Sequence, residues 1–170
     1  MSSLTHTINI RPINQHELME MEWEGEYSCF RRIYAETFNR MLAGLANIIV
    51  AVTGASYVIG QVCLQYDSNR KELADGISRA YLFAFRIRPE YRNLGIGSKM
   101  LAYCENELVE KGYTYLTLNV AKENNSAIRL YQRKGFKIVA PEPGQWSYID
   151  QHGQLKHVNE PSWRFQKKLR

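Results

Sequence analysis

The sequence predicts an α/β or α+β fold in which a mixed sheet packs against helices. Two β-branched, apolar runs, Asn47 to Val52 and Tyr57 to Tyr66, are joined by Thr53-Gly54-Ala55-Ser56, a pattern typical of a β-hairpin. An apolar run from Tyr81 to Ile87 and an alternating run from Tyr113 to Val120 predict two more strands, with a helical pattern between them. Strands separated by helices, after a hairpin, indicate this class.

The remaining elements follow in order. Thr7 to Ile13 alternates as a first strand does, and Asn14 can cap a following helix with Glu17 as capping-box partner. Residues 15–45 are mostly helical in composition, and Gly25 divides them into two helices. The second of these has an apolar face of Phe30, Ile33, Tyr34, Phe38, Met41 and Leu45.

Five glutamates lie in the first helix of this pair with no Lys or Arg between them: Glu17, Glu20, Glu22, Glu24 and Glu26. One interpretation is a solvated helix face. The other is a rim that attracts a cationic amine, since grouped carboxylates raise the local concentration of cations.

Loops, prolines and glycines also divide the second half of the chain into separate elements. A polar loop spans Asp67 to Ser78, and Pro89 ends the strand at Ile87 because it has no N–H for the ladder. The following helix has an apolar face of Ile96, Met100, Cys104 and Leu108, and Gly112 suits the left-handed residue after its end. The later elements are a helix at Ser126 to Lys134 stopped by Gly135, a strand at Phe136 to Val139, a turn at Pro141 to Gly144, a hairpin of Trp146 to Asp150 and Leu155 to Val158, and a closing strand at Trp163 to Leu169.

Length and composition set further limits. A chain of 170 residues with 45% hydrophobic and 23% charged residues fits one globular domain, residues 1–170. The first residues do not resemble a secretory signal, and no apolar run approaches the roughly 20 residues of a membrane span, so we expect no membrane association. Cys29, Cys63 and Cys104 are an odd number without paired spacing, which favours reduced thiols and a cytoplasmic location. The apolar surroundings of Cys63 and Cys104 predict burial.

The formal net charge of +5 raises the alternative of nucleic-acid binding. No run interleaves aromatic residues with dense Lys and Arg, and a polyanionic cofactor accounts for local basic residues equally well. The histidines, His6, His16, His152 and His157, lack metal-ligand spacing, so we expect no metal.

The segment Arg92-Asn93-Leu94-Gly95-Ile96-Gly97 joins a strand to a helix N-terminus. Free N–H groups and the helix dipole favour an anion there, and glycine allows close approach to the backbone. Arg92, Ser98 and Lys99 can add donors. The loop is neither a P-loop, which ends in Gly-Lys-Ser/Thr, nor a dinucleotide fingerprint, which needs a third glycine.

Two motifs together carry a family resemblance. Arg92-x-x-Gly95-x-Gly97 after Pro89-Glu90-Tyr91 resembles the acetyl-CoA pyrophosphate loop of the GNAT superfamily of N-acetyltransferases. Asn124-x-Ser126-Ala127-x-x-Leu130-Tyr131-x-x-x-Gly135-Phe136 resembles its second cofactor motif. The resemblance implies a GNAT-like, mostly antiparallel sheet of about seven strands with an extra hairpin near the C-terminus. It also implies acetyl transfer from acetyl-CoA to a primary amine of a small molecule or peptide, by direct attack in a ternary complex.

The resemblance also implies the cofactor residues. The pyrophosphate would be held by Arg92, Asn93, Leu94, Gly95, Ile96, Gly97 and Ser98. The backbone at Phe85 and Ile87 would pair with the pantetheine amides, and Asn124 and Ala127 would border the same arm. Asn124 can equally be a helix cap. Arg129, Arg133 or Lys134 could reach the 3′-phosphate, and we single out Arg133.

Tyr131 matches the tyrosine that the superfamily uses as general acid. A phenol with a pKa near 10 is protonated at neutral pH and can give a proton to a departing thiolate. The alternative is that Tyr131 packs as an ordinary helix aromatic.

The general base is missing from the motif. The chain resembles the ribosomal-protein-alanine acetyltransferase branch, in which a Glu lies on the fifth strand, but Asn119 occupies that position. Three options stay open: a Glu between positions 20 and 26, a water chain near Asn119 and Asn124, or bulk solvent. This departure keeps a non-catalytic acyl-CoA-binding sensor as the alternative function.

The hairpin from Gln145 to Val158 contains Trp146, Tyr148 and His152. It could form a lid over the acceptor or a dimer surface, and both a monomer and a homodimer fit the sequence.

Overall fold

The computed structural model describes residues 7–170. A seven-stranded sheet has the order β1-β2-β3-β4-β5-β9-β6, and β7 and β8 form a separate two-stranded ribbon. The strands are β1 (Asn9–Pro12), β2 (Ala46–Val52), β3 (Val58–Gln65), β4 (Arg79–Ile87), β5 (Tyr115–Ala121), β6 (Lys137–Glu142), β7 (Gln145–Ile149), β8 (Leu155–Asn159) and β9 (Ser162–Lys168). The α-helices are α1 (Arg31–Leu42), α2 (Ile96–Glu110) and α3 (Asn125–Arg133), and the 3-10 helices are η2 (Gln15–Glu22), η3 (Ser28–Phe30) and η4 (Pro89–Tyr91).

All the predicted strands and the three long helices are present, and the extra hairpin is β7–β8. Every sheet pairing is antiparallel except that of β4 with β5, as expected.

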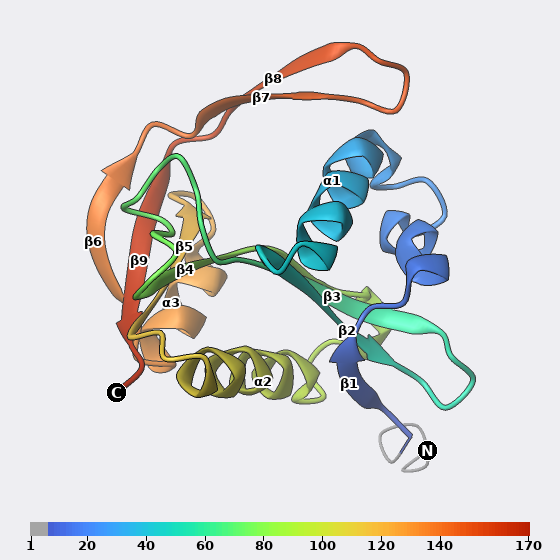
Figure 1. Cartoon of the computed structure of the whole chain (residues 1–170), viewed down its shortest axis with the longest axis horizontal. Helices are drawn as coiled ribbons and strands as arrows, with labels where there is room; N and C mark the ends of the chain where they lie inside the picture. Colours follow the sequence, from blue (N-terminus) through green and yellow to red (C-terminus); the bar gives the residue numbers. More distant parts are fainter. Residues whose placement is uncertain (1–6) are drawn as a thin grey trace.

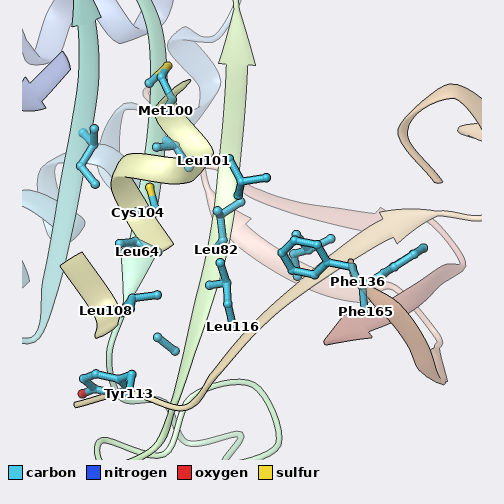
Figure 2. Close-up of a cluster of buried hydrophobic side chains, with 14 of the residues drawn as sticks. Leu64, Leu82, Met100, Leu101, Cys104, Leu108, Tyr113, Leu116, Phe136 and Phe165 are labelled. Atoms are coloured by element: carbon cyan, nitrogen blue, oxygen red, sulfur yellow. The ribbon is translucent and has the colours of Figure 1, made fainter. Parts of the chain in front are cut away.

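The sheet separates two hydrophobic cores. One lies under α1 and η2 and contains Tyr34, Phe38 and Met21. The other lies on the opposite face, where α2 and α3 pack (Figure 1). Figure 2 shows the second core, in which Met100, Leu101, Cys104 and Leu108 of α2 face the strand residues Leu64, Leu82 and Leu116. Both Cys63 and Cys104 are buried, as predicted.

A bulge interrupts β4. Gln61 is opposite Arg86 and Cys63 is opposite Phe83, so Val62 faces two residues of β4, Ala84 and Phe85. Ala84 takes up the extra residue with φ at 53°. An extra residue reverses the alternation of side chains along a strand. Before the bulge, Leu82 faces α2. After it, Phe85 and Ile87 face α2 and Arg86 faces α1.

The parallel pair β4 and β5 separates beyond this point. Their register runs from Arg79 opposite Tyr115 to Leu82 opposite Leu118 and then stops, although β4 continues to Ile87 and β5 to Ala121. Strand β4 stays paired with β3, and β5 with β9. The two strands therefore diverge in the middle of the sheet, and their facing edges are unpaired beyond Leu82 and Leu118.

The predicted turn at Pro141 to Gly144 is wrong. Strand β6 continues through Glu142, with Pro141 opposite Trp163 of β9. Proline is tolerated because β6 is the edge strand of the sheet and needs no donor on its outer side. The chain does not reverse at Pro143 and Gly144, because Glu142 lies opposite Ser162 and Gln145 opposite Asn159, so β7–β8 continues the β6–β9 pair in the same register. The turn lies between β7 and β8, at residues 150–154.

The acidic segment fits neither of its two predicted interpretations. Four of its five carboxylates accept hydrogen bonds from the chain: Glu17 from Arg11, Glu20 from the Val58 amide, Glu22 from Arg31, and Glu24 from Arg88. Glu17 and Glu22 are buried, with relative exposures of 1% and 4%. These hydrogen bonds tie the acidic segment to β1 through Arg11, to β3 through Val58 and to α1 through Arg31. Among these five, Glu26 alone is an exposed carboxylate without an ion-pair or hydrogen-bond partner in the described chain.

Candidate functional site

A cavity of about 1210 Å³ lies where β4 and β5 separate. Its floor is formed by Tyr81 to Arg86 of β4 and Leu118 to Ala121 of β5. Residues from η3 and α1 line one wall, α3 lines a second, and the root of the β7–β8 hairpin lines a third. The cavity thus joins both faces of the sheet through the gap between the strands.

Four of the predicted cofactor residues line this cavity: Phe85, Asn124, Ala127 and Tyr131. The others lie outside its wall: Ile87, the loop from Arg92 to Ser98, and Arg133. Ile87 and the loop nevertheless continue the same surface. A Cβ added at Gly97 would lie 3.8 Å from the Phe85 ring and 3.9 Å from Ile87 Cγ1, so the first turn of α2 sits directly on this end of β4. Arg133 is exposed at the end of α3, apart from these residues.

The loop before α2 has the backbone that an anion site needs. Gly95 is the N-cap residue with φ at 82°, and Asn93 also has a positive φ of 62°. No side chain caps the helix, so its first N–H groups remain available. The Arg92 Nε donates to the Ile87 carbonyl at 2.9 Å, which fastens the loop to β4. This structure is consistent with a phosphate at the helix N-terminus.

Tyr131 packs among aromatic residues and still borders the cavity. Its ring lies 5.5 Å from Phe136 and 6.3 Å from Phe165, centroid to centroid. Burial raises the pKa of its phenol to about 12. The ring is packed, as one interpretation expected, and the hydroxyl stays protonated throughout the neutral range. Its role as general acid stays a prediction.

Asn124 caps α3, as one of its two interpretations required. Its Oδ1 accepts from the Ala127 amide at 3.2 Å and from the Ser126 hydroxyl at 3.3 Å. Because Asn124 also lines the cavity, the cap fixes Ala127 and Tyr131 on the same wall.

The structure adds a pair that the sequence analysis did not assign. The Asn119 Nδ2 lies 3.4 Å from the Tyr81 hydroxyl across the point where β4 and β5 separate. The Asn119 Oδ1 is buried and has no hydrogen-bond partner in the described chain. Burial, with a further contribution from Glu142, raises the pKa of Tyr81 to about 12. A buried acceptor without a partner in a cavity wall is a site for a bound donor.

The β7–β8 hairpin packs against its own chain. Phe30 of η3 lies 6.4 Å from Trp146 and 5.0 Å from Tyr148, measured between ring centroids, and Gln151 donates to Ser28 at 3.2 Å. In Figure 1 the hairpin extends from the β6–β9 side of the sheet toward α1. The contacts fit the predicted lid over the cavity.

The carboxylates between positions 20 and 26 do not line the cavity, so the first option for a general base loses its geometric support. The carboxylates that do line it are Glu142 and Glu160. Glu142 is buried and bound by Arg70 at 2.7 Å and by Arg164 at 3.1 Å. Both of its oxygens thus accept hydrogen bonds from guanidinium groups.

Two further observations concern metal ions and membranes. Within residues 7–170, no group of three or more His, Cys, Asp or Glu side chains is arranged to hold a metal ion, while His6 lies outside the described residues. No helix in the same range is long and apolar enough to cross a bilayer.

The glycine loop before α2 and the cavity at the separated strands adjoin at the same end of β4. The chain belongs to the acetyltransferase (GNAT) family, whose model matches residues 15–136. The family resemblance seen in the two motifs is thus confirmed, and with it the expected use of acetyl-CoA.

Sequence and structure comparisons agree with this. N-alpha-acetyltransferase 50 of Danio rerio is 32% identical over 108 residues, which cover 61% of each chain. This match and two others to curated relatives span between 46% and 61% of the length of those relatives. Among solved structures, the ribosomal-protein-S18-alanine N-acetyltransferase of Escherichia coli superposes with a TM-score of 0.70 at 17% identity, covering 95% of this chain and 94% of that one. A Salmonella typhimurium structure with acetyl-CoA as its cofactor gives 0.70 at 15% identity, covering 96% and 94%.

Tyr131→Phe is expected to lower kcat by about 100-fold, the usual effect of removing a positioned proton donor. Steady-state kinetics with acetyl-CoA and a primary amine test this, with Tyr115→Phe outside the cavity as the control. Because burial raises the pKa of Tyr131 to about 12, kcat of the wild type should show no decline from this group below about pH 11. An unchanged kcat in Tyr131→Phe removes the assigned role.

Proposed function

We propose that this protein is an N-acetyltransferase that moves acetyl from acetyl-CoA to the primary amine of a small molecule or peptide, in a ternary complex. The observation that carries this proposal is that the separated β4–β5 pair and Tyr131 line one cavity, while the uncapped N-terminus of α2 packs on the adjoining end of β4. We also propose that residues 1–170 act as one domain in the cytoplasm, where the cysteines would stay reduced.

The residues have separate roles in the proposed acetyl transfer. The first turn of α2 and the loop from Arg92 to Ser98 bind the pyrophosphate, and the free edge of β4 at Phe85 and Ile87 pairs with the pantetheine amides. The bound thioester supplies the acetyl carbon. The neutral amine attacks that carbon, and the carbon–sulfur bond breaks as the tetrahedral intermediate collapses. Tyr131 gives its proton to the departing sulfur.

The proton that leaves the amine needs an acceptor, and Asn119 offers a route to one. An amide cannot take up a proton, but its unpartnered Oδ1 can hold an attacking amine or an ordered water through N–H or O–H donation. The Tyr81 hydroxyl beside it extends the same polar strip. We therefore favour the water-chain option for proton removal, with Asn119 as the residue that positions it.

A peptide N-terminus is one candidate acceptor, because the zebrafish relative is named as an N-alpha-acetyltransferase and a Drosophila melanogaster relative as a probable N-acetyltransferase. The non-catalytic sensor is not favoured, since Tyr131 is present and borders the cavity.

Acetyl-CoA should raise the melting temperature of the wild type. A ligand at about 100 times its Kd adds about 2.7 kcal/mol to the free energy of unfolding, which is several degrees for a chain of this size. Gly97→Glu places a carboxylate where the pyrophosphate is expected, and the shift should vanish. Ile77→Glu, at an exposed position outside the site, should keep it. No shift in the wild type at millimolar acetyl-CoA contradicts the proposal.

Asn119→Ala is expected to reduce kcat/KM for the amine by about 10-fold or more, the effect of one lost hydrogen bond to the reacting group, of about 1.4 kcal/mol. The KM for acetyl-CoA should stay within about twofold, since that substrate is held elsewhere. Asn39→Ala, on the exposed side of α1, serves as the matched control. Equal losses toward amine and acetyl-CoA would show that Asn119 only supports the fold.

A further inference from the structure

One positively charged side chain that lines the cavity, Arg86, has no carboxylate partner among the described residues. The lining contains the charged residues Arg70, Arg86, Glu142 and Glu160. Arg70 is paired with Glu142 at 2.7 Å. Arg86 forms no ion pair with any carboxylate of residues 7–170. Its neighbour on the same strand segment, Arg88, is bound to Glu24 at 2.8 Å.

The Arg86 guanidinium is held in one orientation by aromatic groups. Its Nη1 donates to the Tyr34 hydroxyl at 2.9 Å, and its central carbon lies 4.1 Å from the centroid of the Tyr27 ring and 5.5 Å from that of Phe30. Stacking fixes the plane of the fork without using its N–H groups.

Most of those N–H groups remain available. A guanidinium has five N–H donors, and Arg86 uses one of them in its hydrogen bond to the Tyr34 hydroxyl. In the described chain, the side-chain nitrogens and oxygens that are buried without a hydrogen-bond partner are Arg40 Nε, Asn47 Oδ1 and Asn119 Oδ1. The other Arg86 nitrogens are not in this group. They are therefore accessible from the cavity, where a planar carboxylate can accept two parallel hydrogen bonds from such a fork.

The position of Arg86 follows from the bulge at Ala84. Without the extra residue, Arg86 would face α2, as Leu82 does. With it, Arg86 lies on the same face as Tyr81 and Phe83, on the floor of the cavity and under α1. Glu142 and Glu160 lie on the other side of the cavity, near β6 and β9. Arg86 is therefore a cation without a carboxylate partner on the α1 side of the cavity, whereas Glu142 is paired with Arg70 and Arg164.

From this geometry we propose that Arg86 binds a carboxylate of the acceptor, so that the preferred substrates carry an anionic group together with the amine. The proposal rests on the acetyltransferase function above and narrows its substrate class. Two sources supply this chemistry: a free amino acid, or a peptide with an acidic residue or terminal carboxylate near its amino end.

The test compares acids with their amides. Wild-type kcat/KM is measured for free amino acids of increasing chain length against the corresponding amino amides, and for short peptides with Asp or Glu at the second position against Asn or Gln. We expect at least one acid to exceed its amide by about 10-fold or more, the size of a charge-assisted bond to a guanidinium of about 1.4 kcal/mol. The pair with the larger ratio identifies the source of the carboxylate.

Arg86→Gln should bring that ratio close to one and leave kcat/KM for the amides within about threefold, because the amides do not use the charge. Arg86→Lys should keep part of the preference, since a point charge lacks the fork. Arg79→Gln, at the start of β4 outside the cavity, should leave the ratio unchanged. If Arg86→Gln lowers acid and amide rates equally, Arg86 only supports the packing of Tyr27 and Tyr34, and the proposal is overturned.

A binding measurement separates this proposal from the proposed function. With free CoA present, the same acids and amides are added and the melting temperature is recorded for the wild type and Arg86→Gln. A rise with acids that is lost in the variant supports the carboxylate site even without turnover of any amine. A wild type that responds equally to acids and amides, or to neither, overturns the carboxylate site, even if acetyl-CoA binding and acetyl transfer are intact.

Discussion

The separation of β4 and β5 after Leu82 and Leu118 is the constraint on which the rest of the site depends. A continuous parallel ladder would use the backbone groups of both strands and close the middle of the sheet. Each strand instead stays paired on its other side, β4 with β3 and β5 with β9, so the opening does not weaken the rest of the sheet. The free edges give an extended substrate arm the partners that a neighbouring strand would have used, and Asn119 lies at the point where they diverge.

The bulge at Ala84 serves both halves of the site. A non-glycine residue at a φ of 53° carries a conformational cost of about 1–2 kcal/mol, so surrounding contacts must stabilise it. The extra residue turns Phe85 toward α2, where it touches the first turn of the helix, and turns Arg86 toward α1 and the acceptor side. One inserted residue thus separates a cofactor face from an acceptor face on consecutive positions of a single strand.

Local patterns predicted most of the fold. The 3–4 spacing of Ile96, Met100, Cys104 and Leu108 placed α2, and the two cofactor motifs located the loop at Gly95 and the cavity residues Asn124 and Tyr131. The remainder depends on contacts distant in sequence. Strict alternation could not reveal a bulge at an alanine, and Asn119 meets Tyr81 across 38 positions. Glu17 and Glu22 resemble solvated residues until Arg11 and Arg31 are placed beside them, and Pro141 reads as a turn residue until β6 is known to be an edge strand.

The central claim is that the free edge of β4 binds acetyl-CoA through its backbone, and amide hydrogen exchange tests it most directly. Exchange of the β5-facing amides between Phe83 and Ile87, and of the first turn of α2, is compared with and without acetyl-CoA. The account predicts new protection at these amides and little change between Arg79 and Leu82, which are already paired with β5. Binding of acetyl-CoA without added protection between Phe83 and Ile87 would contradict it.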